Sequence, residues 1–498
     1  MNTFMNQLSN NVNYKRTENG ALAHKTTNSA VYDLFAFGAA YRTRSDEDCI
    51  FLFKKAFEED ERLALKCLFY IRDCRGGQGE RRFFRTCFRW LAENYPKRVA
   101  FLVQYLPEYG RYDDMFELLD TPLESTVISI IKTQLIQDMN SFKNGISLIA
   151  KWLPSENASN HDTIAKARKI RKSLGITAKH YRQMLSKLRE KINVLERLMS
   201  ANEWEKIEFD KIPSKAGLIY KNAFARRDII ARKYENFAKD KDTKVNASTL
   251  YPYEVVAKAT ESYCFSLLTD TDRAMINKYW ENLPDYLNGE ECKIMCVVDT
   301  SGSMTGFGAS APINVAISLG MYCAERIGGP FKNHYISFSR EPQLIKVEGI
   351  DFVDKARRIY KTNLCQNTNL KGVFDLLLQT ALKPGVNKED IPETIVVISD
   401  MEIDQGSYYT YNSRPWTEEN AATEMESIRK EWARYGFKLP RLIYWNVNAR
   451  HDTILDSGPN VTFVSGFSPS LFKQVLTGKN GYDLMIETIC ADRYINIK

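Results

Sequence analysis

The chain has 498 residues, of which 44% are hydrophobic and 26% are charged, the ordinary balance of a soluble globular protein. At about 100 to 200 residues per domain, this length predicts two to four domains. No apolar run reaches the roughly 18 residues that a membrane-spanning helix needs, which argues against an integral membrane protein. The N-terminal segment MNTFMNQLSNNVNYKR is too polar for a secretory signal peptide, so we expect none.

The net charge of +7 is unevenly distributed along the chain. Residues 289–498 carry 23 Lys and Arg against 25 Asp and Glu, whereas residues 1–288 carry 46 against 37. A polyanionic partner is therefore expected to bind the first part of the chain. The ten cysteines lack the paired spacing of zinc sites and the density of a disulfide scaffold, so we expect buried free thiols in a cytoplasmic protein.

The first part of the chain has a helical pattern. From Ser45 to Phe142 apolar residues recur at helical spacing, and the breaks between successive patterns are short. Helical patterns resume from Thr163 to Leu198 and from Ala216 to Phe237. Helices joined by short turns predict helix pairs stacked as in a HEAT-like repeat module.

A glycine-rich stretch, Arg75 to Arg81 (RGGQGER), interrupts two of these helical patterns. It lacks the preceding strand and the Lys-Ser or Lys-Thr pair of a nucleotide-binding loop. We therefore predict a tight interhelix turn with Glu80 opening the next helix. A second role stays open, in which Arg72 and Arg75 face a central hole and contact phosphates.

Residues 161–200 form the most basic segment, with eleven Lys and Arg against three acidic residues. Gly175 divides the segment, and Thr177 can cap the second of two helices. Two interpretations stay open, because such a face is either simply solvated or binds phosphates in a salt-dependent and weakly sequence-selective way. Charge density alone selects the candidate contacts in this segment: Lys166, Arg168, Lys169, Arg171, Lys172, Lys179 and Arg182.

After residue 288, apolar strand-like runs alternate with amphipathic helical stretches, which is typical of a mainly parallel, Rossmann-like α/β sheet. The expected strands are Cys292–Val298, His334–Phe338, Thr394–Ile398, Arg441–Val447 and Val461–Val464. The expected helices are Ile313–Ile327, Leu370–Leu382, Glu418–Tyr435, Ser470–Leu476 and Tyr482–Cys490.

Oxygen-bearing side chains gather where these strands end. Asp299, Ser301 and Ser303 follow the first strand, Asp400 follows the third, and Thr368 lies in a loop between them. Ligand sites of such sheets lie beyond the carboxyl ends of the strands, and hard cations prefer oxygen ligands. The pattern predicts a divalent-cation site, with Mg²⁺ as the expected ion; a site of this kind that stays empty is the alternative.

The five residues together resemble the metal-ion-dependent adhesion site (MIDAS) of von Willebrand factor A domains. The resemblance implies that Ser301, Ser303 and Thr368 bind the metal directly, while Asp299 and Asp400 act mainly through bound waters. It also implies that a carboxylate of a partner completes the coordination.

Longer stretches resemble the Ro autoantigen class, in which a helical-repeat module named TROVE closes into a ring with a von Willebrand factor A domain. The matching stretches are Thr17–Arg42, Leu68–Arg85 and Lys151–Ser155 (KWLPS). Residues 213–256 are similar to the joining segment of an uncharacterised Ro-related family with the same two modules. The resemblance implies a TROVE-like module over residues 1–288 and a von Willebrand factor A-like domain over residues 289–498.

The same resemblance implies an RNA-binding, ribonucleoprotein component. We expect it to be non-enzymatic, cytoplasmic and monomeric. Ro proteins hold single-stranded ends of misfolded RNA in the ring and small structured RNA on the outer helices. The alternative is a protein-interaction module whose metal captures an acidic side chain of a partner, without RNA. Catalysis is disfavoured, because the five histidines form no cluster near the metal motif, where hydrolysis would need a placed base.

Overall fold

The computed structural model describes residues 13–498 except 19, 142–144, 193, 261–267, 307, 339–340, 363–368, 404–423, 457 and 459. Most of the described residues are helical, and one six-stranded sheet occupies the C-terminal part. The prediction of a helical first part followed by a mainly parallel sheet is therefore confirmed. Among the residues that the structure describes, no helix combines the length and the apolar composition needed to cross a bilayer.

Short helices joined by short turns make up the first part of the chain. A two-stranded antiparallel hairpin precedes them, β1 (Tyr14–Arg16) and β2 (Leu22–His24). The helices are α2 (Ala30–Phe37), α3 (Asp46–Glu59), α4 (Glu61–Arg72), α5 (Arg82–Asn94), α6 (Pro96–Val99), α7 (Leu106–Tyr109), α8 (Glu124–Asn140), α9 (Ile149–Trp152), α10 (His161–Ser173), α11 (Ala178–Lys191), α12 (Leu195–Ser200), α13 (Ser214–Ala225), α14 (Asp228–Lys239), α15 (Pro252–Thr260) and α16 (Asp270–Glu281).

Polar side chains fix where several of these helices begin. The side chains of Ser45, Asp60 and Asn160 accept hydrogen bonds from backbone amides in the first turns of α3, α4 and α10. Thr177 accepts from the amide of His180 at 3.2 Å and so begins α11, as the sequence predicted. Gly175, at φ +69°, ends the preceding helix in a left-handed conformation that glycine adopts without strain.

The sheet has the strand order β5-β4-β3-β6-β7-β8, and all of its neighbours are parallel except β5, which pairs antiparallel to β4. Its strands are β3 (Ile294–Asp299), β4 (His334–Phe338), β5 (Leu344–Lys346), β6 (Thr394–Ser399), β7 (Arg441–Asn446) and β8 (Val461–Ser465). Counted within the sheet, this is the 3-2-1-4-5-6 order of doubly wound folds, whose switch point lies between β3 and β6.

Helices accompany the strands in alternation, as predicted. They are α17 (Pro312–Arg326), α18 (Phe352–Thr362), α19 (Leu370–Ala381), α20 (Glu424–Arg434), α21 (Leu471–Leu476) and α22 (Gly481–Ile489). Helix α17 packs on β3, β4 and β6. Gly320 allows this close approach, because a Cβ there would lie 2.4 Å from a methyl group of Val298. The predicted helix Glu418–Tyr435 is confirmed from Glu424, and its first residues lie outside the described part of the chain.

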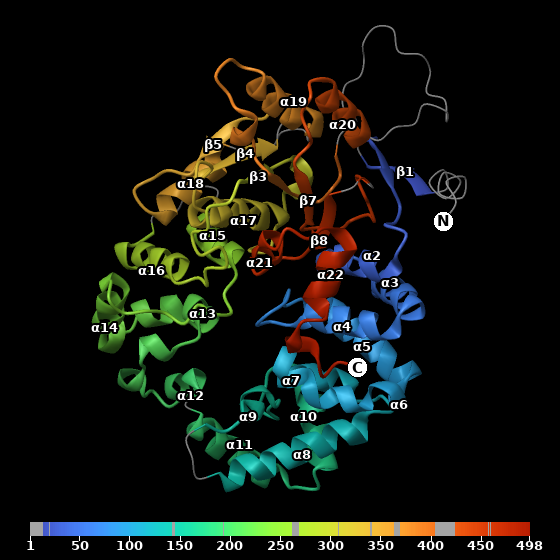
Figure 1. Cartoon of the computed structure of the whole chain (residues 1–498). Helices are drawn as coiled ribbons and strands as arrows, with labels where there is room; N and C mark the ends of the chain where they lie inside the picture. The colour runs from blue at the N-terminus through green and yellow to red at the C-terminus, as the bar shows by residue number, and fades with distance from the viewer. Residues whose placement is uncertain are drawn as a thin grey trace.

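The beginning of the chain packs against the end of the sheet. Figure 1 shows α2 and α4 (blue) beside β8 and α22 (red), and these elements are in contact. The Tyr32 hydroxyl accepts a hydrogen bond from the amide of Phe463 at 2.8 Å, and Ser465 Oγ donates to the carbonyl of Phe35 at 3.1 Å. Helix α2 therefore covers the edge strand β8, whose backbone would otherwise be exposed.

A second contact, which we call the C-terminal clasp, joins the last residues to α4. Its short helix η9 (Asp492–Tyr494) presents Arg493, whose Nη2 donates to the buried Asp73 carboxylate at 2.7 Å. The hydroxyl of Tyr494 donates to the same carboxylate at 3.0 Å, and the Tyr494 carbonyl accepts from Lys66 Nζ at 3.0 Å. Figure 1 shows the helices and the sheet following one another around a ring, and the contacts between the two ends of the chain close it.

The structure confirms the predicted turn after α4. The side chain of Glu80 accepts hydrogen bonds from the amides of Arg82 and Phe83, at 2.9 and 3.4 Å, and so opens α5. A side chain at Gly77 would lie 2.0 Å from the carbonyl of Tyr70, so the turn needs glycine there. The eight described cysteines are free and mostly buried, also as predicted.

Candidate functional site

The sheet-edge candidate lies at the switch point of the sheet, where β3 and β6 end side by side. Asp299 is the last residue of β3 and Asp400 directly follows β6, and both carboxylates are fully buried. The Ser301 and Ser303 hydroxyl oxygens lie 3.0 Å apart. Four of the five predicted metal-site residues are thus brought to one edge, and Thr368 lies outside the described residues.

Hydrogen bonds orient both carboxylates. Asp299 accepts from the amide of Ser301 at 2.9 Å and from the hydroxyl of Ser399 at 2.5 Å. Asp400 accepts from the amide of Glu402 at 3.2 Å and from the Arg450 guanidinium at 3.1 Å. The two groups are therefore held in place before any ligand arrives.

Burial, together with the charge of Asp400, raises the pKa of Asp299 to about 7. Burial also raises the pKa of Asp400, against the opposing effects of the Glu402 amide, Ser303 and Arg450. Two buried carboxylates that repel each other, beside two hydroxyls, fit a hard divalent cation such as Mg²⁺. Asp299, Ser301, Ser303 and Asp400 would hold the ion, which stays a prediction.

A second acidic group adjoins this edge. Glu18, Glu402 and His451 each offer a ligand atom, and these atoms lie within 4.8 Å of one another. Arg450 connects the two groups, because it contacts Asp400 and also Glu18, at 2.9 Å. His451, which follows β7, is one histidine and not a cluster of histidines, so the expectation that catalysis is disfavoured stays a prediction.

The second candidate is an open cavity of about 1520 Å³, lined almost entirely by residues of the helical part of the chain. It exceeds the roughly 300 to 1,000 Å³ of ordinary small-molecule sites. Only three acidic side chains line it, Glu80, Glu156 and Glu196, against eleven basic ones. The basic residues are Arg42, Arg72, Arg75, Arg81, Arg82, Arg111, Lys151, Arg182, Arg189, Arg197 and Lys215.

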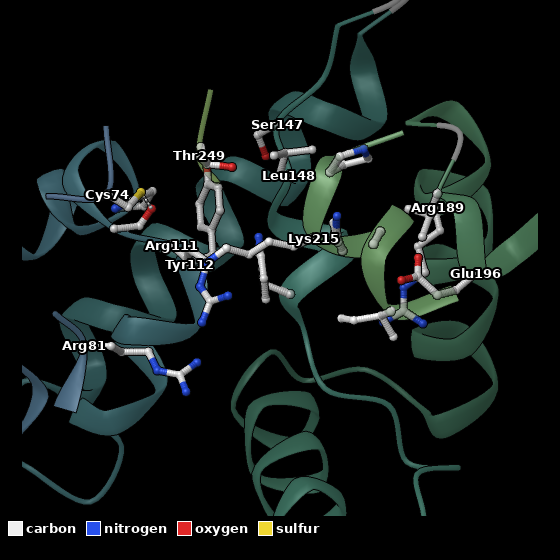
Figure 2. Close-up of a pocket in the computed structure, with 18 of the residues that line it drawn as sticks. Cys74, Arg81, Arg111, Tyr112, Ser147, Leu148, Arg189, Glu196, Lys215 and Thr249 are labelled. Atoms are coloured by element: carbon white, nitrogen blue, oxygen red, sulfur yellow. Dashed lines mark hydrogen bonds between the residues drawn. The ribbon is translucent and has the colours of Figure 1, made fainter. Parts of the chain in front are cut away.

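Three arginines, Arg75, Arg81 and Arg111, lie on one side of the cavity, and we call them the arginine wall. Figure 2 shows Arg81 and Arg111 on this side and Arg189 and Glu196 across the cavity. Arg81 is exposed and forms no ion pair with the described residues. Arg75 donates to the carbonyl of Glu108, which leaves its charge unbalanced.

On the opposite side two arginines, Arg189 and Arg197, serve the fold. Arg189 donates to the carbonyls of Ala150 and Leu153, both at 2.8 Å, and to the hydroxyl of Ser155 at 2.9 Å. Arg197 pairs with Glu203 at 3.3 Å. Arg182, on the same helix as Arg189, is exposed and forms no ion pair with a described residue. An anion in the cavity would therefore find free donors on Arg182 and on the arginine wall.

Aromatic side chains also line the cavity: Tyr112, Trp152, Tyr181, Tyr220, Tyr251 and Tyr253. The guanidinium carbon of Arg111 lies 4.2 Å from the centre of the Trp152 ring, and Lys151 Nζ lies 5.7 Å from it. Cations beside aromatic rings are the combination that single-stranded nucleic acids bind.

The residues predicted to bind RNA fall into three groups. Arg72, Arg75 and Arg182 line the cavity, although Arg72 is buried in an ion pair with Asp114 at 2.7 Å. In α10 and its end, three residues are paired with acids: Lys166 with Glu117, Lys169 with Asp120 and Glu124, and Arg171 with Glu156. Arg168, Lys172 and Lys179 are exposed and do not line the cavity. Binding by these residues stays a prediction.

Sequence reasoning overlooked most of the cavity. Four of its basic residues come from separate segments, so no local run of charge in the sequence predicts that they meet: Arg42, Arg81, Arg111 and Lys215. The one available signal was the arginine density of the segment from Arg72 to Arg85.

Two family models match the chain. The model described as Domain of unknown function (DUF2828) matches residues 17–129 and 122–290, and Domain of unknown function (DUF7788) matches residues 293–492. Uncharacterized protein L728 of Acanthamoeba polyphaga mimivirus is 30% identical over 94% of this chain and 85% of its own length. The crystal structure of the Deinococcus radiodurans Ro (RSR) protein covers 93% of this chain and 99% of its own, at 12% identity and a TM-score of 0.35. That likeness is too low to decide the fold family or the ligand.

Proposed function

We propose an RNA-binding function for this chain, which belongs to the DUF2828 family. The cavity takes a single-stranded segment or free end of RNA, and the protein acts without catalysis. The observation that carries the proposal is the large cavity lined by eleven basic and three acidic side chains. RNA recognition favours unpaired bases, and phosphates supply most of the affinity of such complexes.

The sequence resemblance supports the same function. Leu68–Arg85 and Lys151–Ser155, two of the stretches that resemble TROVE modules, contribute Arg75, Arg81 and Trp152 to the cavity. The strand order and the Asp-x-Ser-x-Ser loop at the switch point support a von Willebrand factor A-like domain. We therefore propose a TROVE-like helical module closed by a domain of that kind.

The metal site has a structural role in this proposal. The hydroxyl of Thr17 donates to the carbonyl of Ile403 at 2.8 Å, and the amide of Glu18 donates to the Glu402 carboxylate at 2.7 Å. The chain's own N-terminal hairpin thus docks beside the metal loops. A cation held by Asp299 and Asp400 would favour ring closure there and would not serve chemistry.

The test is fluorescence anisotropy with an RNA hairpin that ends in a single-stranded extension of about ten nucleotides. A blunt hairpin of the same stem is the comparison. We expect preference for the extended RNA, and affinity that falls steeply between about 50 and 200 mM salt.

Two double variants locate the binding. Arg81→Glu with Arg182→Glu reverses two charges of the cavity, and we expect at least a tenfold loss of affinity. Arg168→Glu with Lys172→Glu reverses the same number of exposed charges outside the cavity. Charge density in the sequence predicts a loss of affinity here too, whereas the cavity proposal expects little change. Equal losses in both variants, or no preference for the extended RNA, would contradict the proposal.

A further inference from the structure

One part of the cavity surface has a shape and chemistry that charge alone does not explain. The indole of Trp152, at the end of α9, lies against the guanidinium of Arg111 at 4.2 Å. Both residues line the cavity, together with Leu148, an apolar side chain that is 49% exposed. The planar guanidinium of Arg111 and the exposed side chain of Leu148 thus line the same cavity.

Arg111 is held in this position from behind. Its backbone amide donates to the Asp114 carboxylate at 2.9 Å, and Asp114 is itself fixed by Arg72 and Arg85, at 2.7 Å each. Gly110 permits the approach, because a Cβ there would lie 2.2 Å from the Asp114 carboxylate. The position of Arg111 is therefore preorganised by a buried network.

The charge of Arg111 is only partly balanced. Its Nε approaches one carboxylate, that of Asp113, at 3.2 Å, yet within the described part of the chain this nitrogen makes no hydrogen bond. Burial lowers the pKa of Arg111, against the opposing charge of Asp113. A guanidinium with an aromatic ring on one side and an incomplete set of acceptors is suited to a ligand that is both flat and polar.

We propose that Arg111 and Trp152 form a stacking subsite for one unpaired nucleobase. The base lies on the cavity side of the Arg111 guanidinium, which in turn lies on the indole of Trp152. Unpaired bases of RNA stack on guanidinium planes as well as on aromatic rings, and such stacking tolerates any base. Arg81 and Lys215, which line the same cavity, serve the phosphates on either side. This inference rests on the proposed function and names how the site selects unpaired RNA over duplex.

The test is an abasic scan of the single-stranded extension, measured by anisotropy with the wild-type protein. Replacing each nucleotide in turn by an abasic one removes the base and keeps the phosphate. We expect one position at which affinity falls about fivefold or more, since stacking of one base contributes on that order.

The abasic scan is repeated with two variants of the arginine wall and with one variant of Trp152. Arg111→Lys keeps the charge and loses the flat guanidinium, so the abasic penalty at that position should disappear. Arg81→Lys is the matched control and should keep the penalty. Trp152→Phe, which retains a smaller ring, should reduce it partly, and thermal unfolding verifies that each variant is folded.

The outcomes separate the two proposals. Tight binding with a flat abasic scan, or a penalty that survives in Arg111→Lys, overturns the stacking subsite and leaves RNA binding standing. No binding of the extended RNA by the wild-type protein overturns the proposed function itself.

Discussion

The C-terminal clasp offers the sharpest test of ring closure, through the substitution Arg493→Leu. The Asp73 carboxylate is fully buried and accepts from both Nε and Nη2 of Arg493. Leucine keeps most of the aliphatic volume and removes both charged donors. Asp73 would retain two donors, the hydroxyl of Tyr494 at 3.0 Å and the amide of Arg75 at 2.9 Å.

The expected loss of stability follows from the buried Asp73 carboxylate, which loses its charged partner. Removing one partner of a fully buried ion pair costs about 3 to 5 kcal/mol, because the remaining charge stays buried and unpaired. The Arg493 side chain is 32% exposed, and Asp73 keeps two hydrogen bonds, so the lower end applies. We expect Arg493→Leu to lower the free energy of unfolding by about 3 kcal/mol.

Urea unfolding measures the change, with two further variants for comparison. Lys239→Leu removes an exposed ion pair with Glu235 within one helix and should cost less than about 1 kcal/mol. Adding Asp73→Asn to Arg493→Leu neutralises the stranded carboxylate and should restore part of the loss. A loss below about 1 kcal/mol in Arg493→Leu, or no recovery in the double variant, would refute a buried, charged clasp.

Three further predictions address pH, metal and the turn. Burial lowers the pKa of His24, against the opposing charges of Glu426 and Asp456, so the unfolded chain takes up a proton more readily below about pH 6.5. His24 therefore contributes a fall in stability as pH drops through that range, by at most about 1.4 kcal/mol per pH unit. Asp299, whose pKa is raised, contributes the opposite slope, so the difference between the wild type and His24→Phe in pH-dependent urea unfolding isolates the histidine. Millimolar Mg²⁺ should raise the thermal midpoint of the wild type but not that of Asp299→Ala, since only a bound ion stabilises the folded state; equal shifts would argue against the site. Gly79→Ala, at φ +65°, should cost about 2 kcal/mol or more in the same unfolding assay, and a neutral result would contradict the turn geometry.

Apolar runs without alternation predicted the buried strands well, because a strand covered on both faces leaves that pattern in any sequence. The strand β4, His334–Phe338, has the predicted bounds, and the other long strands differ by one or two residues at an end. The strand β5, Leu344–Lys346, was overlooked, because it is three residues long and largely exposed at the sheet edge. The local pattern of apolar residues does not predict a short edge strand whose side chains are mostly exposed.

The metal loops could be predicted because parallel strands bring their carboxyl ends to one edge whatever the helices do. The cavity could not, because its charge comes from side chains far apart in sequence. Charge density pointed to α10, yet Lys166 and Lys169 are paired with acids that precede or begin α8. Whether a basic side chain is available to bind a phosphate depends on the acidic side chains that the fold places beside it. Composition and local charge density do not predict those neighbours.

The clasp and the cavity share one loop, which connects closure of the ring to the surface proposed for RNA. Asp73 holds Arg493 and also accepts from the amide of Arg75, the first member of the arginine wall. Two residues later, a side chain at Gly77 would collide with the carbonyl of Tyr70, so the turn has little freedom to adopt another shape. The last residues of the chain thus contact, through Asp73, the loop that presents Arg75 and Arg81 to the cavity, without lining the cavity themselves. The loop's own hydrogen bonds, Gln78 to Tyr70 and Glu80 to Ile71, do not involve Arg493, so we expect loss of Arg493 to weaken ring closure more than it changes the shape of the arginine wall.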